Sequence, residues 1–192
     1  MIVVIKKKTM VITALCVLVA LMAGVARISY DKPAAAVPVA ARTVILDPGH
    51  GGEDGGAVGG AGTVEKDLNL AVALKVQQLL EQSGCMVFMT RTEDTSIHDN
   101  GEEKSGNRKV SDLNNRKKLP KDFKADAFVS IHMNTFPDPQ YYGSQVFYAE
   151  KQPGSMELAM AIQQELKQNI DNGNIRESKE SAGNIYILND VS

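Results

Sequence analysis

The segment TVILDPGH at residues 43–50 decides the fold class of this sequence. Its first half is short, apolar and β-branched, which predicts a buried strand. Pro48 and the dense glycines that follow it, as far as Gly62, predict a loop directly after that strand. His50 lies within the start of this loop, so a side chain with ligand chemistry comes immediately beyond the end of the strand.

Predicted helices and strands alternate along the rest of the chain. Apolar residues at helical spacing, among them Leu68 and Leu79, predict the first helix, and Pro120 is expected to end the second. The predicted helices cover residues 65–82, 107–119 and 155–170. Short apolar runs predict further strands at residues 85–90, 126–132, 143–149 and 184–188. This order predicts an α/β fold, a single three-layer sandwich whose mostly parallel sheet is flanked by helices.

The N-terminus stands apart from this pattern. Residues 1–30 combine a lysine cluster with an apolar run at 10–26, the plan of a secretory signal peptide. Because roughly 17 apolar residues is the lower limit for spanning a bilayer, a membrane anchor is a close alternative. Residues 31–42 are rich in Ala, Pro and Val and are typical of an extended linker. We therefore expect an exported domain at residues 43–192, with membrane contact only through the N-terminal segment.

Charge and residue usage exclude several classes of protein. Lys and Arg number 21 against 23 Asp and Glu, a net charge of −2. This balance argues against a nucleic-acid-binding protein that depends on bulk positive charge. The chain has 2 Cys and 3 His, which excludes a disulfide scaffold and a cysteine-rich zinc finger. Any histidine-based metal site must therefore be built from very few residues.

Two of the three histidines fall where an open α/β sheet binds its ligands, beyond the carboxyl ends of its strands. His50 follows the first strand, His132 ends the strand predicted at 126–132, and Glu65 begins the first helix. Two imidazoles and one carboxylate, with a fourth position left to water, form a ligand set of catalytic zinc sites. His98 lies in a polar loop and is expected only to be solvated.

Less specific interpretations of the same residues stay open. A histidine at the end of a strand is commonly just a polar cap, and Glu65 is well placed to interact with the helix dipole. The glycine-rich loop at 49–56 could instead cradle a phosphate group. That alternative is weak, because the loop matches neither GxGxxG nor GxxxxGK[ST].

Further motifs follow these residues in order along the chain. They are DPGHGG at 47–52, DGGA at 54–57, EKDLNL at 65–70, TR at 90–91, DLNNR at 112–116 and SIHMN at 130–134. Together they resemble the zinc-dependent N-acetylmuramoyl-L-alanine amidases of the amidase-3 family, over about residues 43–188. Within that family the chain is most similar to the spore-germination-specific amidases.

The resemblance implies a zinc hydrolase that cleaves the amide bond between N-acetylmuramic acid and L-alanine in peptidoglycan. It implies that Zn²⁺ is held by His50, Glu65 and His132. The implied substrate is spore-cortex peptidoglycan on the way to muramic lactam, in the forespore or cortex compartment, and an accessory lipoprotein is a candidate partner. The substrate contacts implied by matching motifs are Arg91, Arg116 and Asn134. For Arg116, a structural ion pair is an equal alternative.

The family pattern continues beyond the point where this sequence stops. After the segment that matches residues 185–188 it has a strand with the pattern Pro-Ala-x-Leu-x-Glu and then a helix. The Glu of that strand is the expected general base. Because Ser192 precedes both elements, we expect a C-terminally incomplete domain and assign no catalytic residue. The alternative function is a truncated, catalytically inactive module that binds zinc and peptidoglycan.

Overall fold

A computed structural model describes residues 42–101, 105–135, 142–170 and 173–189. Apart from Arg42, the predicted signal or anchor and the predicted linker lie outside the described residues. Among the residues described, no helix is both long enough and apolar enough to cross a membrane.

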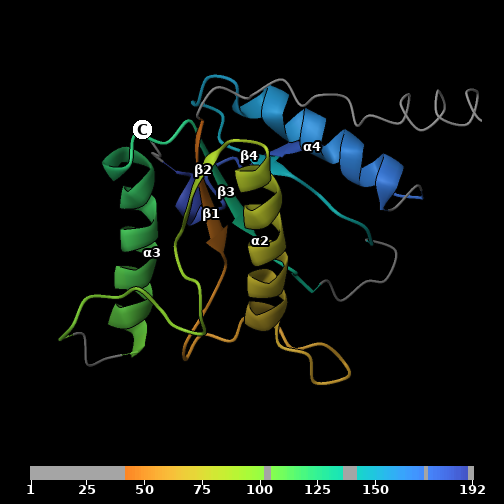
Figure 1. The fold of residues 1–192 in the computed structure, drawn as a ribbon. Coiled ribbons are helices and arrows are strands. Elements are labelled where there is room, and N and C mark those ends of the chain that lie inside the picture. Colours follow the sequence, from red (N-terminus) through yellow and green to blue (C-terminus); the bar gives the residue numbers. More distant parts are fainter. Residues whose placement is uncertain (1–41, 102–104, 136–141, 171–172, 190–192) are drawn as a thin grey trace, which may run out of the picture. The chain divides into compact units, whose positions relative to one another are not determined.

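Helices and strands alternate as predicted, and the α/β fold is confirmed (Figure 1). The helices are α2 (Glu65–Gln82), α3 (Ser105–Asp122), α4 (Ser155–Asn169) and the short 3-10 helix η1 (Tyr186–Leu188). The strands are β1 (Thr43–Pro48), β2 (Met86–Met89), β3 (Ala127–Ile131), β4 (Phe147–Tyr148) and β5 (Lys179–Glu180).

β1 is the central strand of a parallel three-stranded sheet with the order β2-β1-β3. Its register pairs Ile45 with Phe88 of β2 on one side and with Phe128 of β3 on the other. In Figure 1, α2 and α3 stand on either side of this strand, and both contact it. Because β1 is covered on both faces, Ile45 and Leu46 are fully buried and the strand has no polar alternation.

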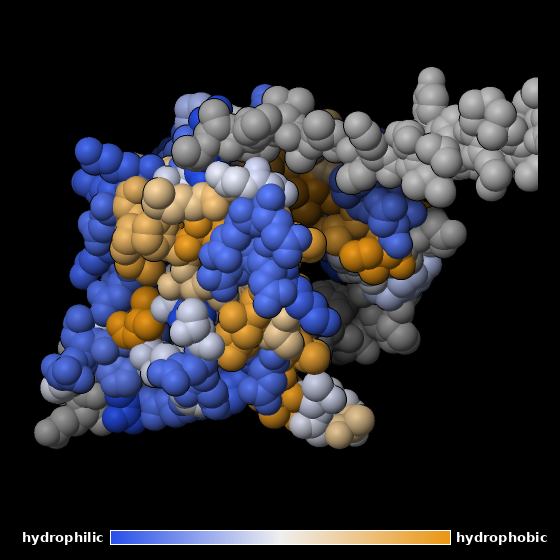
Figure 2. All heavy atoms as spheres, in the orientation of Figure 1, coloured by the Kyte–Doolittle hydropathy of each residue, from blue (hydrophilic) through white to orange (hydrophobic). Residues whose placement is uncertain are grey.

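The first helix buries a different stripe from the one its apolar residues suggest. Glu65, Asn69 and Ala73 are the buried residues of α2, whereas Leu68 and Leu79 are exposed. Helical spacing identifies a helix, but the packing of α2 against β1, β2 and β3 decides which face is covered. Hydrophobic residues also reach the surface in several patches among hydrophilic ones (Figure 2).

The predicted end of α3 is wrong by a few residues. Pro120 does not stop the helix but lies within its last turn, and α3 runs on to Asp122. The missing proline N–H costs only one helical hydrogen bond there, and the Phe123 N–H still donates to the Leu119 carbonyl at 3.0 Å.

The C-terminal part of the prediction is the least accurate. β4 and β5 form a separate parallel pair, and the polar β5 carries no apolar signal in the sequence. The strand predicted at 184–188 is wrong, because Tyr186–Leu188 forms η1. Its apolar residues pack against α3 instead of joining a sheet, with Ile187 buried and the Tyr186 hydroxyl donating to Asn114 at 2.6 Å.

Asp126 fixes the start of β1 beside β3. Its carboxylate accepts hydrogen bonds from the Thr43 N–H and the Arg42 guanidinium, both at 2.8 Å. Its own N–H donates to the Thr43 carbonyl, also at 2.8 Å. The Thr43 N–H, followed by Arg42, holds the pKa of Asp126 below its ordinary value.

Asp126→Ala is expected to destabilise the domain at neutral pH, with a penalty that fades in acid. Because the pKa of this carboxyl is lower in the folded chain, its contribution is present above the ordinary value of 3.8. That contribution is lost as the pH falls through the lower, folded pKa. Urea unfolding of both proteins at neutral pH and at about pH 2 measures the change. A difference that is the same at both pH values would contradict it.

Candidate metal centre

The three predicted ligands meet at the carboxyl edge of the sheet. His50 lies just beyond β1, His132 directly follows β3, and Glu65 is the first residue of α2. Glu65 Oε1 is 3.4 Å from His50 Nε2 and 3.0 Å from His132 Nδ1. One potential ligand atom from each residue lies within 4.8 Å of the others. Two imidazoles and a carboxylate this close together could hold a divalent metal ion.

Glu65 is a well-defined anionic member of this group. Its side chain is only 4% exposed, and it accepts hydrogen bonds from the N–H groups of Ala57 at 2.9 Å and Met133 at 3.0 Å. Burial raises the pKa of Glu65, but the hydrogen bonds from Ala57 and His132 outweigh it, so the pKa lies below its ordinary value. The carboxylate is therefore kept ionised, as a metal ligand must be.

Two glycines let the loop backbone approach the ligands. A Cβ at Gly56, whose φ is +71°, would lie 2.6 Å from His50 Cδ2 and 2.9 Å from Glu65 Oε2. A Cβ at Gly49 would collide with the ring of His132. The main chain at Gly49 and Gly56 thus lies directly against the two imidazoles. A side chain at either position would occupy the space of a histidine ring. We call this arrangement the glycine cradle.

Asp54 orients the first imidazole. Its Oδ2 lies 3.0 Å from His50 Nδ1, so a donated Nδ1–H leaves the Nε2 lone pair free on the side of Glu65. A carboxylate behind a histidine ligand is a common way of fixing its tautomer. Burial alone would raise the pKa of Asp54. The contacts with His50 and Lys109 have a larger effect in the opposite direction, so the pKa of Asp54 lies below its ordinary value. This role of Asp54 is not predicted from the sequence, where its spacing of four residues from His50 is the available signal.

Arg91 and Arg116 do not lie on a surface that a substrate could reach. Their exposed fractions are 3% and 2%. Arg91 donates only to main-chain carbonyls, and Arg116 donates to carbonyls and to the carboxylates of Asp47 and Asp112. Burial therefore argues against the substrate contacts expected from their motifs, and for Arg116 the ion-pair alternative is the one seen. Asn134 is exposed two residues beyond His132, so its substrate contact stays a proposal.

Asp47 connects the metal edge, the edge of the sheet where the candidate ligands His50, Glu65 and His132 meet, to three other elements. It is 1% exposed and accepts hydrogen bonds from Thr90 at 2.7 Å, Ser130 at 2.6 Å and Arg116 at 2.7 Å. These partners come from the end of β2, from β3 and from α3. This role of Asp47 is not predicted from the sequence, where an acidic residue near the end of a buried strand is the available signal.

The third histidine lies apart from the candidate metal ligands. His98 contacts the neighbouring Ser96 hydroxyl in the loop before α3 and is not part of the cluster. This placement makes it a natural control for experiments on the other two histidines.

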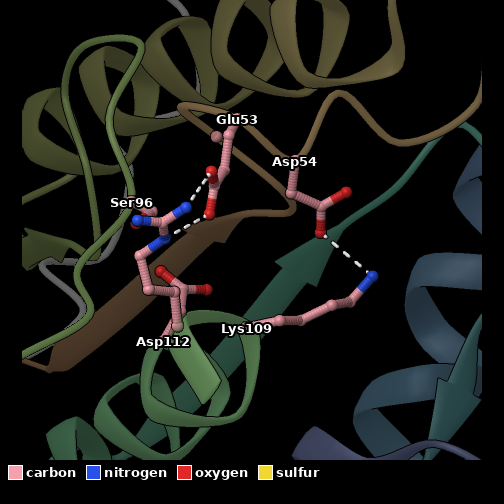
Figure 3. A pocket seen from close by; sticks show the side chains of 7 residues that line it. Glu53, Asp54, Ser96, Lys109 and Asp112 are labelled. Atoms are coloured by element: carbon pink, nitrogen blue, oxygen red, sulfur yellow. Dashed lines mark hydrogen bonds and ion pairs between the residues drawn. The ribbon is translucent and has the colours of Figure 1, made fainter. Parts of the chain in front are cut away.

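A pocket of about 200 Å³ lies between the glycine-rich loop and α3 (Figure 3). Its lining is polar and comprises Gly51, Glu53, Asp54, Ser96, Arg108, Lys109 and Asp112. Arg108 donates two hydrogen bonds to Glu53, at 2.6 and 2.7 Å, and Lys109 Nζ is 3.2 Å from Asp54. These ion pairs tie the loop that carries His50 to the first turns of α3.

The fold and the site together define an α/β protein with a His-Glu-His group of potential metal ligands at the edge of a parallel sheet. The family profile described as N-acetylmuramoyl-L-alanine amidase matches residues 44–192. The chain belongs to this family.

Individual relatives agree with the family match. The germination-specific N-acetylmuramoyl-L-alanine amidase of Bacillus subtilis is 40% identical over 156 residues, which cover 81% of this chain and 65% of the relative. The chain thus spans just under two thirds of that relative's length.

Solved structures also resemble the chain. The CwlD amidase of Clostridioides difficile, in complex with the GerS lipoprotein, has a TM-score of 0.74 and 42% identity, covering 79% of this chain and 77% of that one. The AmiC2 amidase of Nostoc punctiforme has a TM-score of 0.62 and 30% identity, with coverage of 79% and 74%.

Proposed function

We propose that this protein is a zinc-dependent N-acetylmuramoyl-L-alanine amidase that acts on peptidoglycan of the spore cortex. The observation that carries the proposal is the convergence of His50, Glu65 and His132 at one edge of the sheet. The donor chemistry of two imidazoles and an ionised carboxylate fits Zn²⁺. The name of the germination-specific Bacillus relative supports the cortex as the target.

The residues around the site have separable tasks. His50, Glu65 and His132 would hold the metal, and Asp54 keeps the His50 ring in its orientation. His132 is 36% exposed, so the site is open to solvent and substrate on its side. When bound, zinc supplies polarisation of the amide carbonyl and activation of water. We assign no general base to a described residue, and the Glu of the family's Pro-Ala-x-Leu-x-Glu strand stays the expected one.

The metal site is tested by zinc content after removal of weakly bound ions. The unaltered protein and the His98→Ala control should retain zinc, whereas His50→Ala and His132→Ala should lose it. Removing one of three protein ligands leaves too few donors for a stable site. Unchanged zinc stoichiometry in both ligand variants would overturn the assignment.

The reaction is tested on purified cortex peptidoglycan. Amide cleavage should release new L-alanine amino groups, which are counted after chemical labelling, in zinc-loaded but not in chelator-treated samples. Binding of zinc and peptidoglycan without such release would instead identify the inactive binding module as the function of this chain.

Export and partnership are part of the proposal. We propose that residues 1–30 direct the domain out of the cytoplasm, as a cleaved signal or an anchor, and that residues 31–42 are a linker. N-terminal sequencing of the protein from the producing cell distinguishes the two.

The CwlD amidase is described in complex with a lipoprotein, which supports an accessory lipoprotein here. Co-purification of the two proteins from spore membranes tests this partnership.

Asp54→Ala should weaken zinc binding by about 10- to 100-fold, because the His50 ring loses the carboxylate that orients it. The matched control is Asp94→Ala. Asp94 accepts from the Gly52 N–H of the same loop at 2.8 Å and from Lys66 at 2.6 Å, and it does not contact a histidine. Competition with a chromogenic chelator gives both affinities. Equal losses in the two variants would show that the loop as a whole, and not the Asp54 contact, determines affinity.

A further inference from the structure

We propose that Arg91 and Arg116 are positioning residues that hold the main chain of the turn at 48–50 and so set the place of the first metal ligand. The inference rests on the proposed function in one respect, namely that His50 binds zinc. It gives the two buried arginines a role other than the substrate contact that their motifs implied.

Arg116 reaches the turn from α3. Its Nη1 donates to the Pro48 carbonyl at 3.0 Å, and its Nη2 donates to the His50 carbonyl at 2.8 Å. Asp47 and Asp112 hold the same guanidinium in place, each at 2.7 Å. Through Arg116, α3 thereby holds the main chain of His50 itself.

Arg91 reaches the turn from just beyond β2. Its Nε donates to the Pro48 carbonyl at 2.9 Å, and its Nη2 donates to the carbonyls of Gly49 at 3.1 Å and Lys66 at 2.8 Å. Lys66 follows Glu65, so Arg91 links the His50 turn to the first turn of the helix that carries the second ligand. Asn69 of α2 adds another donor to the Gly49 carbonyl, at 3.1 Å.

The turn needs such support because of its backbone conformation. His50 has a φ of +63°, in the left-handed region that is unfavourable for a residue with a Cβ. Three consecutive carbonyls, those of Pro48, Gly49 and His50, all accept guanidinium hydrogen bonds. These bonds satisfy buried acceptors only while the turn keeps this conformation, and therefore stabilise it against relaxation.

His50 is consequently held at two points. Arg116 holds its carbonyl, and Asp54 holds its ring at Nδ1. If the main chain is released, the ring can pivot about the Asp54 contact, and Nε2 moves relative to Glu65. Lysine cannot substitute for either arginine, because one ammonium cannot reproduce a planar fork that serves several carbonyls at once.

The test uses Arg116→Lys and Arg91→Lys, with Gln163→Leu as the matched control. Gln163 is also buried and bonds to three groups, those of Val146, Ser144 and Arg176, around β4 and β5. We expect both arginine variants to bind zinc about 10- to 100-fold more weakly and to shift the visible absorption of bound Co²⁺. Gln163→Leu should lower the melting temperature but leave both metal readouts unchanged.

Two results would overturn the inference. One is wild-type zinc affinity with an unchanged Co²⁺ spectrum in both arginine variants. The other is an equal loss of affinity in Gln163→Leu, which would show general destabilisation. If Arg116→Lys fails to fold, Arg91→Lys decides alone, since the hydrogen bonds of Arg91 all go to carbonyls and no buried carboxylate loses a partner.

A metal-free measurement separates this inference from the proposed function. Imidazole ¹⁵N spectra of the protein without metal should show a shifted His50 ring in both arginine variants and an unshifted one in Gln163→Leu. Absence of zinc binding by the unaltered protein would overturn the proposed function, and the His50 resonances would still decide the positioning role. Unchanged resonances would overturn that role even if zinc binds.

Discussion

Arg116→Met is expected to lower the free energy of unfolding by about 3–5 kcal/mol. The Arg116 guanidinium lies 2.7 Å from the Asp47 carboxylate, and the two side chains are 2% and 1% exposed. Burial alone would lower the pKa of Arg116. Asp47 and Asp112 have a larger effect in the opposite direction, so the pKa lies above its ordinary value and the guanidinium stays charged. Methionine fills much of the volume but leaves Asp47 as a buried charge without a cation. Urea unfolding of the two proteins measures the loss.

The exposed pair Arg42–Asp126 is the control for this prediction. It has nearly the same separation, 2.8 Å, but its side chains are 62% and 38% exposed. Arg42→Met should therefore destabilise the domain much less than Arg116→Met, because solvent screens the exposed pair. Adding Asp47→Asn to Arg116→Met should recover part of the loss, because it removes the uncompensated charge. Strictly additive losses in the double variant would contradict the explanation.

Gly56→Ala should abolish zinc binding at micromolar concentrations while the domain stays folded. The added methyl group would stand 2.8 Å from His50 Nε2 and 2.9 Å from Glu65 Oε2, so it displaces two of the three ligands. The substitution also strains the backbone, because φ at this position is +71°. Isothermal titration with zinc, alongside a thermal unfolding curve, gives both quantities.

Gly62→Ala separates backbone strain from the collision. Gly62 has a similar φ of +80°, but a Cβ there would meet nothing within 4 Å. It should cost comparable stability and leave zinc binding intact. If both variants bind zinc normally, the glycine cradle does not constrain the ligands.

The sequence predicts the part of the fold that depends on hydrophobic patterning. The uninterrupted apolar run of β1 requires burial on both faces, and this places His50 and His132 at the same edge of a parallel sheet. The convergence of His50 and His132, two of the three candidate metal ligands, could therefore be predicted. Exposure of Leu68 and Leu79 could not, because periodicity does not tell which side of a helix its neighbours cover.

Roles that depend on long-range polar contacts could not be assigned from the sequence either. Arg91 and Arg116 occur in motifs beside the site, and their charge suggests contact with an anionic substrate, although for Arg116 a structural ion pair is an equal alternative. Only the tertiary structure shows that both guanidinium groups donate to the carbonyls of the turn at 48–50, more than 40 residues away. The strand predicted at 184–188 is wrong for a related reason. An apolar run forms a strand only where it pairs with another strand. Among the described residues, this segment instead forms η1 and packs on α3.

The contacts of Asp47 have a consequence for how the domain opens. One carboxylate joins β1 to the end of β2, to β3 and to α3. Fluctuations that would separate any one of these elements must first break a buried charged hydrogen bond. The metal edge should therefore belong to the most slowly exchanging cooperative unit of the domain, so that its amide protons exchange with solvent only when the whole unit unfolds.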